Sequence, residues 1–307
     1  MRKNGLDLLR GIAAFGIVGC HLGLSNRTPV GMWVTALCDF NVGLFAAISG
    51  FSMKDGDGYV KRRAKRILPV DLVWCLVYIL ATAIFDIMMD GGQLNERYCS
   101  LRYWAGVLFL GDAAAHLWFL ICLFYAQCIL SGIVSVCRLK SRGAMALLAL
   151  VSVLLLICSV SWDNWYCKYP LRLLAFLSLG YLMKRYAANR ITIPLIGIVL
   201  MLGVHLGLHG VFHGFVRDYL LVIPVMMFFS SDWFSESKLT AVLCVTSLGV
   251  YLIHLLFVRA ASWWILRTIV PPYSAFVVLA EWVIVWCISL LAVVMLKKVP
   301  FANRFLR

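Results

Sequence analysis

The segment LDLLRGIAAFGIVGCHLGL (residues 6–24) places two ionisable side chains, Arg10 and His21, inside one apolar run. A helix rises about 1.5 Å per residue, so the two residues lie roughly 16 Å apart along its axis. Their spacing is close to three whole turns, which directs both side chains from nearly the same helix face. Because a charged side chain is costly inside a bilayer, the pair predicts a functional site on a membrane helix.

The remainder of the chain has the composition of an integral membrane protein. Of its 307 residues, 63% are hydrophobic and 14% are charged, and the mean hydropathy is +0.92. Soluble domains are about half apolar and about a quarter charged. The sequence therefore predicts an all-α, polytopic membrane protein, with residues 1–307 forming one transmembrane domain and no separate soluble domain.

About ten membrane-spanning helices fit the recurrence of apolar stretches, with nine or eleven as the alternatives. We expect them over residues 5–25, 33–53, 67–89, 115–137, 143–161, 170–186, 191–209, 215–231, 240–261 and 274–297. The shorter apolar piece from Trp104 to Leu110 is expected to be re-entrant or interfacial. No cleavable signal peptide is expected, because the first apolar run exceeds signal length.

The basic residues predict the orientation of these helices. An even number of spans puts both termini on one side, and nineteen Lys and Arg residues then fall in inner segments against eight in outer segments. This excess favours cytoplasmic termini. The net charge of +14 then reflects topology and contact with anionic membrane lipid, and we expect no nucleic-acid partner.

Arg10 alone has a second explanation. Asp7 lies three residues earlier, a spacing at which the two side chains can form an ion pair at the inner edge of the membrane. Arg10 would then extend to the interface as an anchor. An anchor does not explain His21, although a lone histidine often forms only local hydrogen bonds.

The run KRRAKRILP (residues 61–69) is the densest cluster of positive charge, with basic side chains at Lys61, Arg62, Arg63, Lys65 and Arg66. A positive-inside anchor is one interpretation. Arginine also binds phosphate through paired hydrogen bonds, and the i, i+3 spacing of Arg63 and Arg66 suits a phosphate-bearing ligand. Just before this run, the small residues around Ser49 predict either close helix packing or a slot for a slender chain.

Two more histidines are expected at the depth of His21. His116 opens HLWFL (residues 116–120), and His254 lies in GVYLIHLLF (residues 249–257). Glu281 is a rare carboxylate within a predicted span. It is a candidate to orient one of the histidines, with Arg172 as its alternative partner.

The other histidines and cysteines give weaker signals. His205, His209 and His213 repeat at a spacing that can bind zinc, but no acidic or cysteine partner accompanies them, so we expect no metal. Cys99 and Cys167 fall in predicted outer loops and are candidates for pairing in an oxidising compartment.

Taken in order, Arg10-x10-His21, NVGLFAAISGF (residues 41–51), KRRAKRILP, HLWFL and YLIH (residues 251–254) resemble the motifs of acyltransferase family 3 membrane proteins. The resemblance spans nearly the whole chain. It implies a stand-alone enzyme of about ten helices that moves acyl groups, often acetyl, from coenzyme A (CoA) onto sugars, polysaccharides or other extracytoplasmic acceptors. It also implies that His21 is catalytic with Arg10 as its companion, and that Arg63 and Arg66 hold CoA.

The chain departs from the family pattern at three places. An alanine follows Phe45 where an aromatic residue is common, Val70-Asp71 follow Pro69 in place of an aromatic ending, and no proline follows His254. These departures leave the Arg10-x10-His21 motif intact and bear on acyl-chain preference.

We therefore expect an acyltransferase of the bacterial cytoplasmic membrane with acyl-CoA, foremost acetyl-CoA, as donor. The phosphates are expected near Lys61, Arg62, Arg63 and Arg66, and the pantetheine arm along Arg10 and Ser49. His21 would be a general base or an acyl carrier, with His116, His254 and Glu281 orienting it or stabilising an oxyanion.

Three other functions remain open from the residues: a transporter that uses intramembrane charges, an anchor or sensor that binds acyl-CoA without turnover, and an unrelated membrane-bound O-acyltransferase. Nothing in the loops specifies the acceptor.

Overall fold

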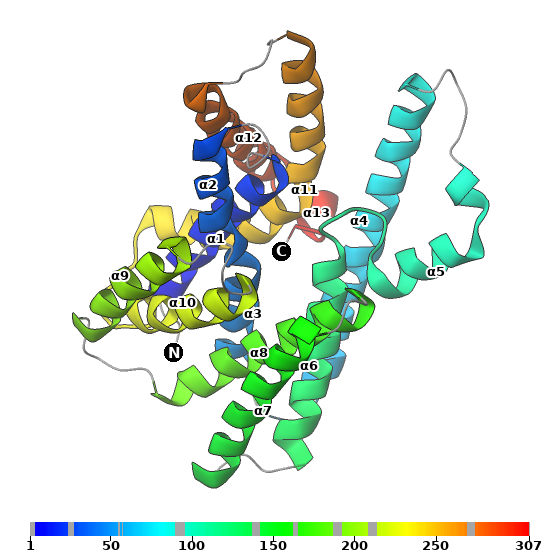
Figure 1. Cartoon of the computed structure of the whole chain (residues 1–307). Helices are drawn as coiled ribbons and strands as arrows, with labels where there is room; N and C mark the ends of the chain where they lie inside the picture. Colours follow the sequence, from blue (N-terminus) through cyan, green and yellow to red (C-terminus); the bar gives the residue numbers. More distant parts are fainter. Residues whose placement is uncertain are drawn as a thin grey trace.

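The computed structural model describes residues 4–23, 28–54, 56, 58–89, 96–136, 142–161, 165–186, 192–207, 214–268 and 274–306. Within these ranges the chain is helical and contains no strand (Figure 1). The helices are α1 (Asn4–His21), α2 (Pro29–Asp39), α3 (Asn41–Phe51), α4 (Tyr59–Met89), η2 (Glu96–Cys99), α5 (Leu101–Leu110), α6 (Trp118–Val136), α7 (Arg142–Ser161), α8 (Trp165–Tyr186), α9 (Thr192–Gly207), α10 (Gly214–Phe229), α11 (Lys238–Thr268), α12 (Ala275–Leu296) and α13 (Pro300–Asn303).

Several of these helices are long and apolar enough to cross a membrane. In the described part of the chain, five segments meet that criterion: Pro29–Phe51, Tyr59–Ile87, Trp118–Val136, Lys238–Ala261 and Ala275–Leu296. Shorter apolar helical segments are Leu101–Leu110, Gly143–Ser159 and Pro194–Val204. The protein is therefore an all-α membrane protein, while the count of ten spans and the cytoplasmic placement of both termini stay predictions.

The helix expected over residues 33–53 is divided at Phe40 into α2 and α3. Phe40 has φ −71° and ψ −11°, so the backbone turns without leaving the helical region. The side chain of Asn41 donates to the carbonyl of Cys38 at 2.7 Å. This bond satisfies a buried carbonyl near the end of α2.

The helix expected to begin at residue 67 begins at Tyr59 instead. Gly56 and Gly58 have φ values of 125° and 75°, a conformation that favours glycine and that turns the chain directly before α4. The basic run therefore lies on the first turns of α4 rather than in a loop, and Pro69 lies inside the helix. Helical spacing then places Arg62 and Arg66 one turn apart.

Close packing brings α3 against α8 and places α1 beside α11, α2 and α3 (Figure 1). At the α3–α8 crossing, a β-carbon at Gly50 would overlap the carbonyl of Leu177, and one at Gly180 would overlap the carbonyl of Ala47. Small residues thus let the two backbones touch. Of the two interpretations left open for this segment, close helix packing is present at Gly50, while Ser49 lines the cavity described below.

Candidate active site

A cavity of about 680 Å³ lies between helices α1, α3, α4, α6 and α11. The residues that line it from α6 are apolar, whereas those that line it from the start of α4 are mostly basic. Its lining residues are Arg10, Phe45, Ser49, Ser52, Lys54, Tyr59, Arg62, Arg63, Arg66, Ile67, Val70, Phe119, Leu120, Leu123, Cys244, Val245, Ser247, Leu248, Tyr251 and Lys297. The space is of the size and mixed character usual for a small-molecule or cofactor site.

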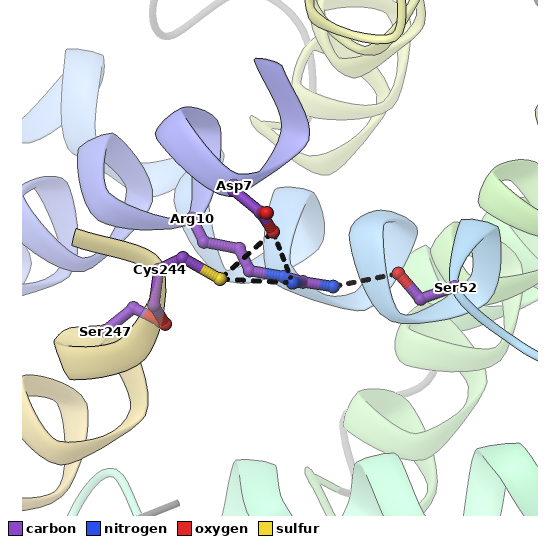
Figure 2. A network of polar contacts seen from close by, with 5 residues as sticks. All are labelled: Asp7, Arg10, Ser52, Cys244 and Ser247. Atoms are coloured by element: carbon purple, nitrogen blue, oxygen red, sulfur yellow. Dashed lines mark hydrogen bonds and ion pairs between the residues drawn. The ribbon is translucent and has the colours of Figure 1, made fainter. Parts of the chain in front are cut away.

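Arg10 links three helices at one side of this cavity. Its guanidinium donates to Asp7 at 2.9 Å and to Ser52, the residue that caps the end of α3, at 2.8 Å. The thiol of Cys244 on α11 donates to Asp7 at 3.0 Å and lies 3.6 Å from the guanidinium (Figure 2). The ion pair expected with Asp7 is present, and the same arginine side chain, 28% exposed, also lines the cavity. The anchor and the site are therefore not exclusive explanations.

The predicted phosphate-binding arginines come together at the cavity. Arg62, Arg63 and Arg66 line it from α4. Arg63 donates through Nε to Gln127 of α6 at 2.9 Å, and its guanidinium lies 5.9 Å from the ring centroid of Tyr59. Lys61 is exposed and is not among the lining residues. The structure thus groups three of the four predicted cations and leaves Lys61 outside.

Two lysines that the sequence did not single out line the cavity together with Arg62, Arg63 and Arg66. We call these five residues the basic wall. Lys54 follows α3, and Lys297 follows α12, and both line the cavity. Lys297 is held there by donating its ammonium to the carbonyl of Val245. Local sequence does not predict this position of Lys297, because it depends on the packing of the end of α12 beside α11.

Aromatic rings close the other end of the cavity. Phe45 and Phe119 have ring centroids 6.5 Å apart, and Phe119 lies 5.6 Å from Tyr251. Phe119 and Tyr251 are buried, and all three rings belong to the lining. Tyr251 also donates its hydroxyl to the backbone carbonyl of His116. A single layer of side chains therefore separates the cavity from His116.

Beyond that layer lies a cluster of three histidines. The ring centroid of His254 lies 5.2 Å from His21 and 5.1 Å from His116, and the rings of His21 and His116 are 6.1 Å apart. His116 and His254 are buried, whereas His21 is half-buried. The ring of Tyr78 packs on His116 at 4.9 Å. The structure brings together the histidines that were expected at one depth on separate helices.

Glu281 and Arg172 lie on different helices of the bundle. Glu281 is buried on α12, and its neighbour Trp282 stacks on Phe15 of α1 with ring centroids 4.2 Å apart. Arg172 is buried on α8, donates to Ser159 at 3.3 Å, and lies over the ring of Tyr169. The part of Glu281 in orienting a histidine stays a prediction.

The described residues contain no group of three His, Cys, Asp or Glu side chains arranged to hold a metal ion. Of the three histidines with a spacing that could bind zinc, His205 belongs to α9. His209 and His213 fall outside the described ranges. Cys99 is exposed and carries a free thiol. The side chain of Cys167, its candidate partner, falls outside the part of the chain that the structure describes.

The chain matches one known protein family over nearly its whole length. Residues 3–296 match the sequence model of the acyltransferase domain of family 3. The chain belongs to acyltransferase family 3. Searches of the curated proteins and of the solved structures returned no significant match. The matched range contains the Arg10-x10-His21 motif, the basic start of α4 and all three clustered histidines, so this family 3 member is a membrane acyltransferase.

Proposed function

We propose that this family 3 protein transfers an acyl group, with acetyl favoured, from cytoplasmic acyl-CoA to a hydroxyl of an extracytoplasmic acceptor. The observation that carries the proposal is that the cavity and the histidine cluster lie side by side. One cavity has basic residues at one end and Tyr251 at the other, and Tyr251 contacts the histidine cluster that contains His21. A sugar or polysaccharide hydroxyl in the bacterial cytoplasmic membrane is the favoured acceptor.

The donor end of the cavity suits a polyanionic nucleotide. Guanidinium groups bind phosphate through charge-assisted hydrogen bonds, and Arg62, Arg63 and Arg66 line this end. Lys54 and Lys297 add compact positive charges. The pantetheine arm would follow the wall that contains Arg10 and Ser49, toward the aromatic end.

His21 would supply the base for the transfer. It accepts the proton of the acceptor hydroxyl while that oxygen forms a bond to the thioester carbonyl carbon. The tetrahedral intermediate then collapses, the carbon–sulfur bond breaks, and the proton passes from His21 to the departing CoA sulfur. In the alternative route a nitrogen of His21 attacks the thioester carbon, and the carbon–sulfur bond breaks to release CoA as thiolate. The acceptor oxygen then attacks the acyl-histidine, its proton passes to the thiolate, and the carbon–nitrogen bond breaks to restore His21. His116, His254 and Glu281 are the candidate supporting residues.

Mass spectrometry of cell-surface glycans and lipids tests this function and identifies the acceptor. We expect one acyl ester to be present in cells that carry the wild-type gene and absent without it. His21→Ala, expressed at the same level, should reproduce the loss. An unchanged set of esters in cells without the gene, or full retention with His21→Ala, would contradict the proposal.

A further inference from the structure

The backbone contacts of His254 determine which of its ring nitrogens carries hydrogen. Nδ1 lies 2.7 Å from the carbonyl oxygen of Tyr251 and 3.2 Å from that of Val250. A carbonyl oxygen can only accept, so Nδ1 must be the donor. In the neutral imidazole, Nε2 of His254 is then an acceptor with an unshared electron pair.

In His116 the two ring nitrogens have the opposite roles. Its Nε2 lies 3.3 Å from the carbonyl oxygen of Leu252. That nitrogen is therefore the donor, and Nδ1 is the acceptor. Neither histidine has a second N–H to offer, so neither can donate to an oxyanion while it is neutral. The role as an oxyanion donor that the sequence left open is therefore not available to them in this arrangement.

Both acceptor nitrogens are buried. Nε2 of His254 and Nδ1 of His116 have no hydrogen-bond partner among the described residues. Buried polar atoms are normally satisfied, so each of these nitrogens calls for a donor. His21 is the nearest ring with an N–H to give, with its centroid 5.2 Å from His254. His21 is also half-buried, so part of its side chain is accessible.

We infer that His254 is a positioning residue that accepts a hydrogen bond from His21 at Nε2. This inference rests on the proposed acyl transfer. Donation of the His21 N–H to His254 leaves the other nitrogen of His21 available to the acceptor hydroxyl. When that nitrogen takes the proton, the positive charge on His21 is stabilised by the electron pair of His254. His254 thus has the place that a carboxylate occupies in a Ser-His-Asp triad.

Two amide substitutions separate this role from a structural one. His254→Gln keeps an acceptor oxygen near the Nε2 position but loses the donor to the backbone. His254→Asn keeps an amide donor near the Nδ1 position but loses the distal acceptor. A hydrogen bond to a charged group contributes enough that its loss slows the reaction about tenfold to a hundredfold. We expect that loss in the kcat of His254→Asn, with His254→Gln the more active of the two.

The comparison uses the full-length protein in membranes and label transfer from radioactive acetyl-CoA. A role limited to tethering the backbone predicts the reverse order, with His254→Asn the more active variant, and that order would overturn the inference. Thermal melting and CoA affinity are measured in parallel, and both should be similar in the two variants. If the wild-type protein transfers no label, the proposed function fails, and the spectroscopic measurement described next decides the positioning role.

A spectroscopic measurement tests the positioning role without any activity. In protein labelled with ¹⁵N-histidine, His254 should appear as the Nδ1–H tautomer. Its Nε2 resonance should shift in His21→Ala, which removes the donor. Gly143→Ala is a remote control, because a β-carbon at that position meets open space, and it should leave the resonance in place. A protonated Nε2 in the neutral ring, or a resonance indifferent to His21→Ala, would overturn the inference.

Discussion

Replacing Arg66 by Gln tests whether the basic wall of the cavity binds the phosphates of CoA. Arg66 is exposed on α4 and lines the cavity. A hydrogen bond to a charged group contributes about 1.5–3 kcal/mol. Arg66→Gln should therefore raise the Kd for CoA about tenfold to a hundredfold.

Lys65→Gln is the matched control for this experiment. Lys65 is the preceding residue on the same helix, is equally exposed, and is not among the residues that line the cavity. Both variants remove one positive charge, so a general electrostatic attraction would weaken binding similarly in both and would fade at high salt. A direct contact weakens binding only in Arg66→Gln.

Equilibrium titration with CoA and with 3′-dephospho-CoA measures the effect in detergent-solubilised protein. If Arg66 contacts the 3′-phosphate, wild type and Arg66→Gln should differ for CoA and bind dephospho-CoA alike. If it contacts the diphosphate, the variant should lose affinity for both probes. Equal Kd values for CoA in wild type, Arg66→Gln and Lys65→Gln would refute the assignment of this wall to the donor phosphates.

Three further outcomes are expected. His21→Ala should lower label transfer from acetyl-CoA about 10²- to 10⁴-fold, the usual contribution of a general base, and a CoA titration should give an unchanged Kd because His21 lies outside the cavity lining. Ser52→Ala removes the 2.8 Å hydrogen bond that holds Arg10. A loss of about 1 kcal/mol corresponds to a Kd for CoA that is about fivefold higher. An unchanged Kd would show that Ser52 does not position Arg10. Gly50→Ala places a methyl group against a backbone carbonyl of α8; such overpacking costs about 1–3 kcal/mol and should lower the melting temperature, whereas Gly143→Ala should not.

Much of the basic side of the cavity could be predicted from local sequence. Arg63 and Arg66 share a helix face because their spacing is one helical turn, and the run around them contains no acidic residue. The start of α4 was predicted too late, at residue 67, whereas the helix begins at Tyr59. The glycines at positions 56 and 58 place the turn earlier.

The residues that complete the site from a distance could not be predicted in the same way. Lys297 reaches the cavity only because α12 ends near α11, where its ammonium meets the carbonyl of Val245. Cys244 joins Arg10 through the packing of α11 on α1. Both contacts depend on tertiary placement, which hydropathy and spacing do not encode.

The histidine cluster could be predicted only in part from the sequence. The depth of His21, His116 and His254 could be estimated from their positions along apolar helices. Their orientation could not, because the tautomers depend on the carbonyls of Val250, Tyr251 and Leu252. Sequence therefore predicted the members of the cluster, and the backbone contacts show what two of them can donate or accept.

Inside-out membrane vesicles can test whether the protein passes an acyl group from cytoplasmic acyl-CoA to an acceptor on the other side of the membrane. Radioactive acetyl-CoA, which does not cross membranes, is supplied to the exposed cytoplasmic face, and label is then sought as an ester in material within the vesicles. We expect labelled ester inside vesicles that carry the wild-type protein. With His21→Ala the amount of labelled ester should fall about 10²-fold or more. Unconsumed acetyl-CoA with wild-type protein, or equal labelling with His21→Ala, would contradict it.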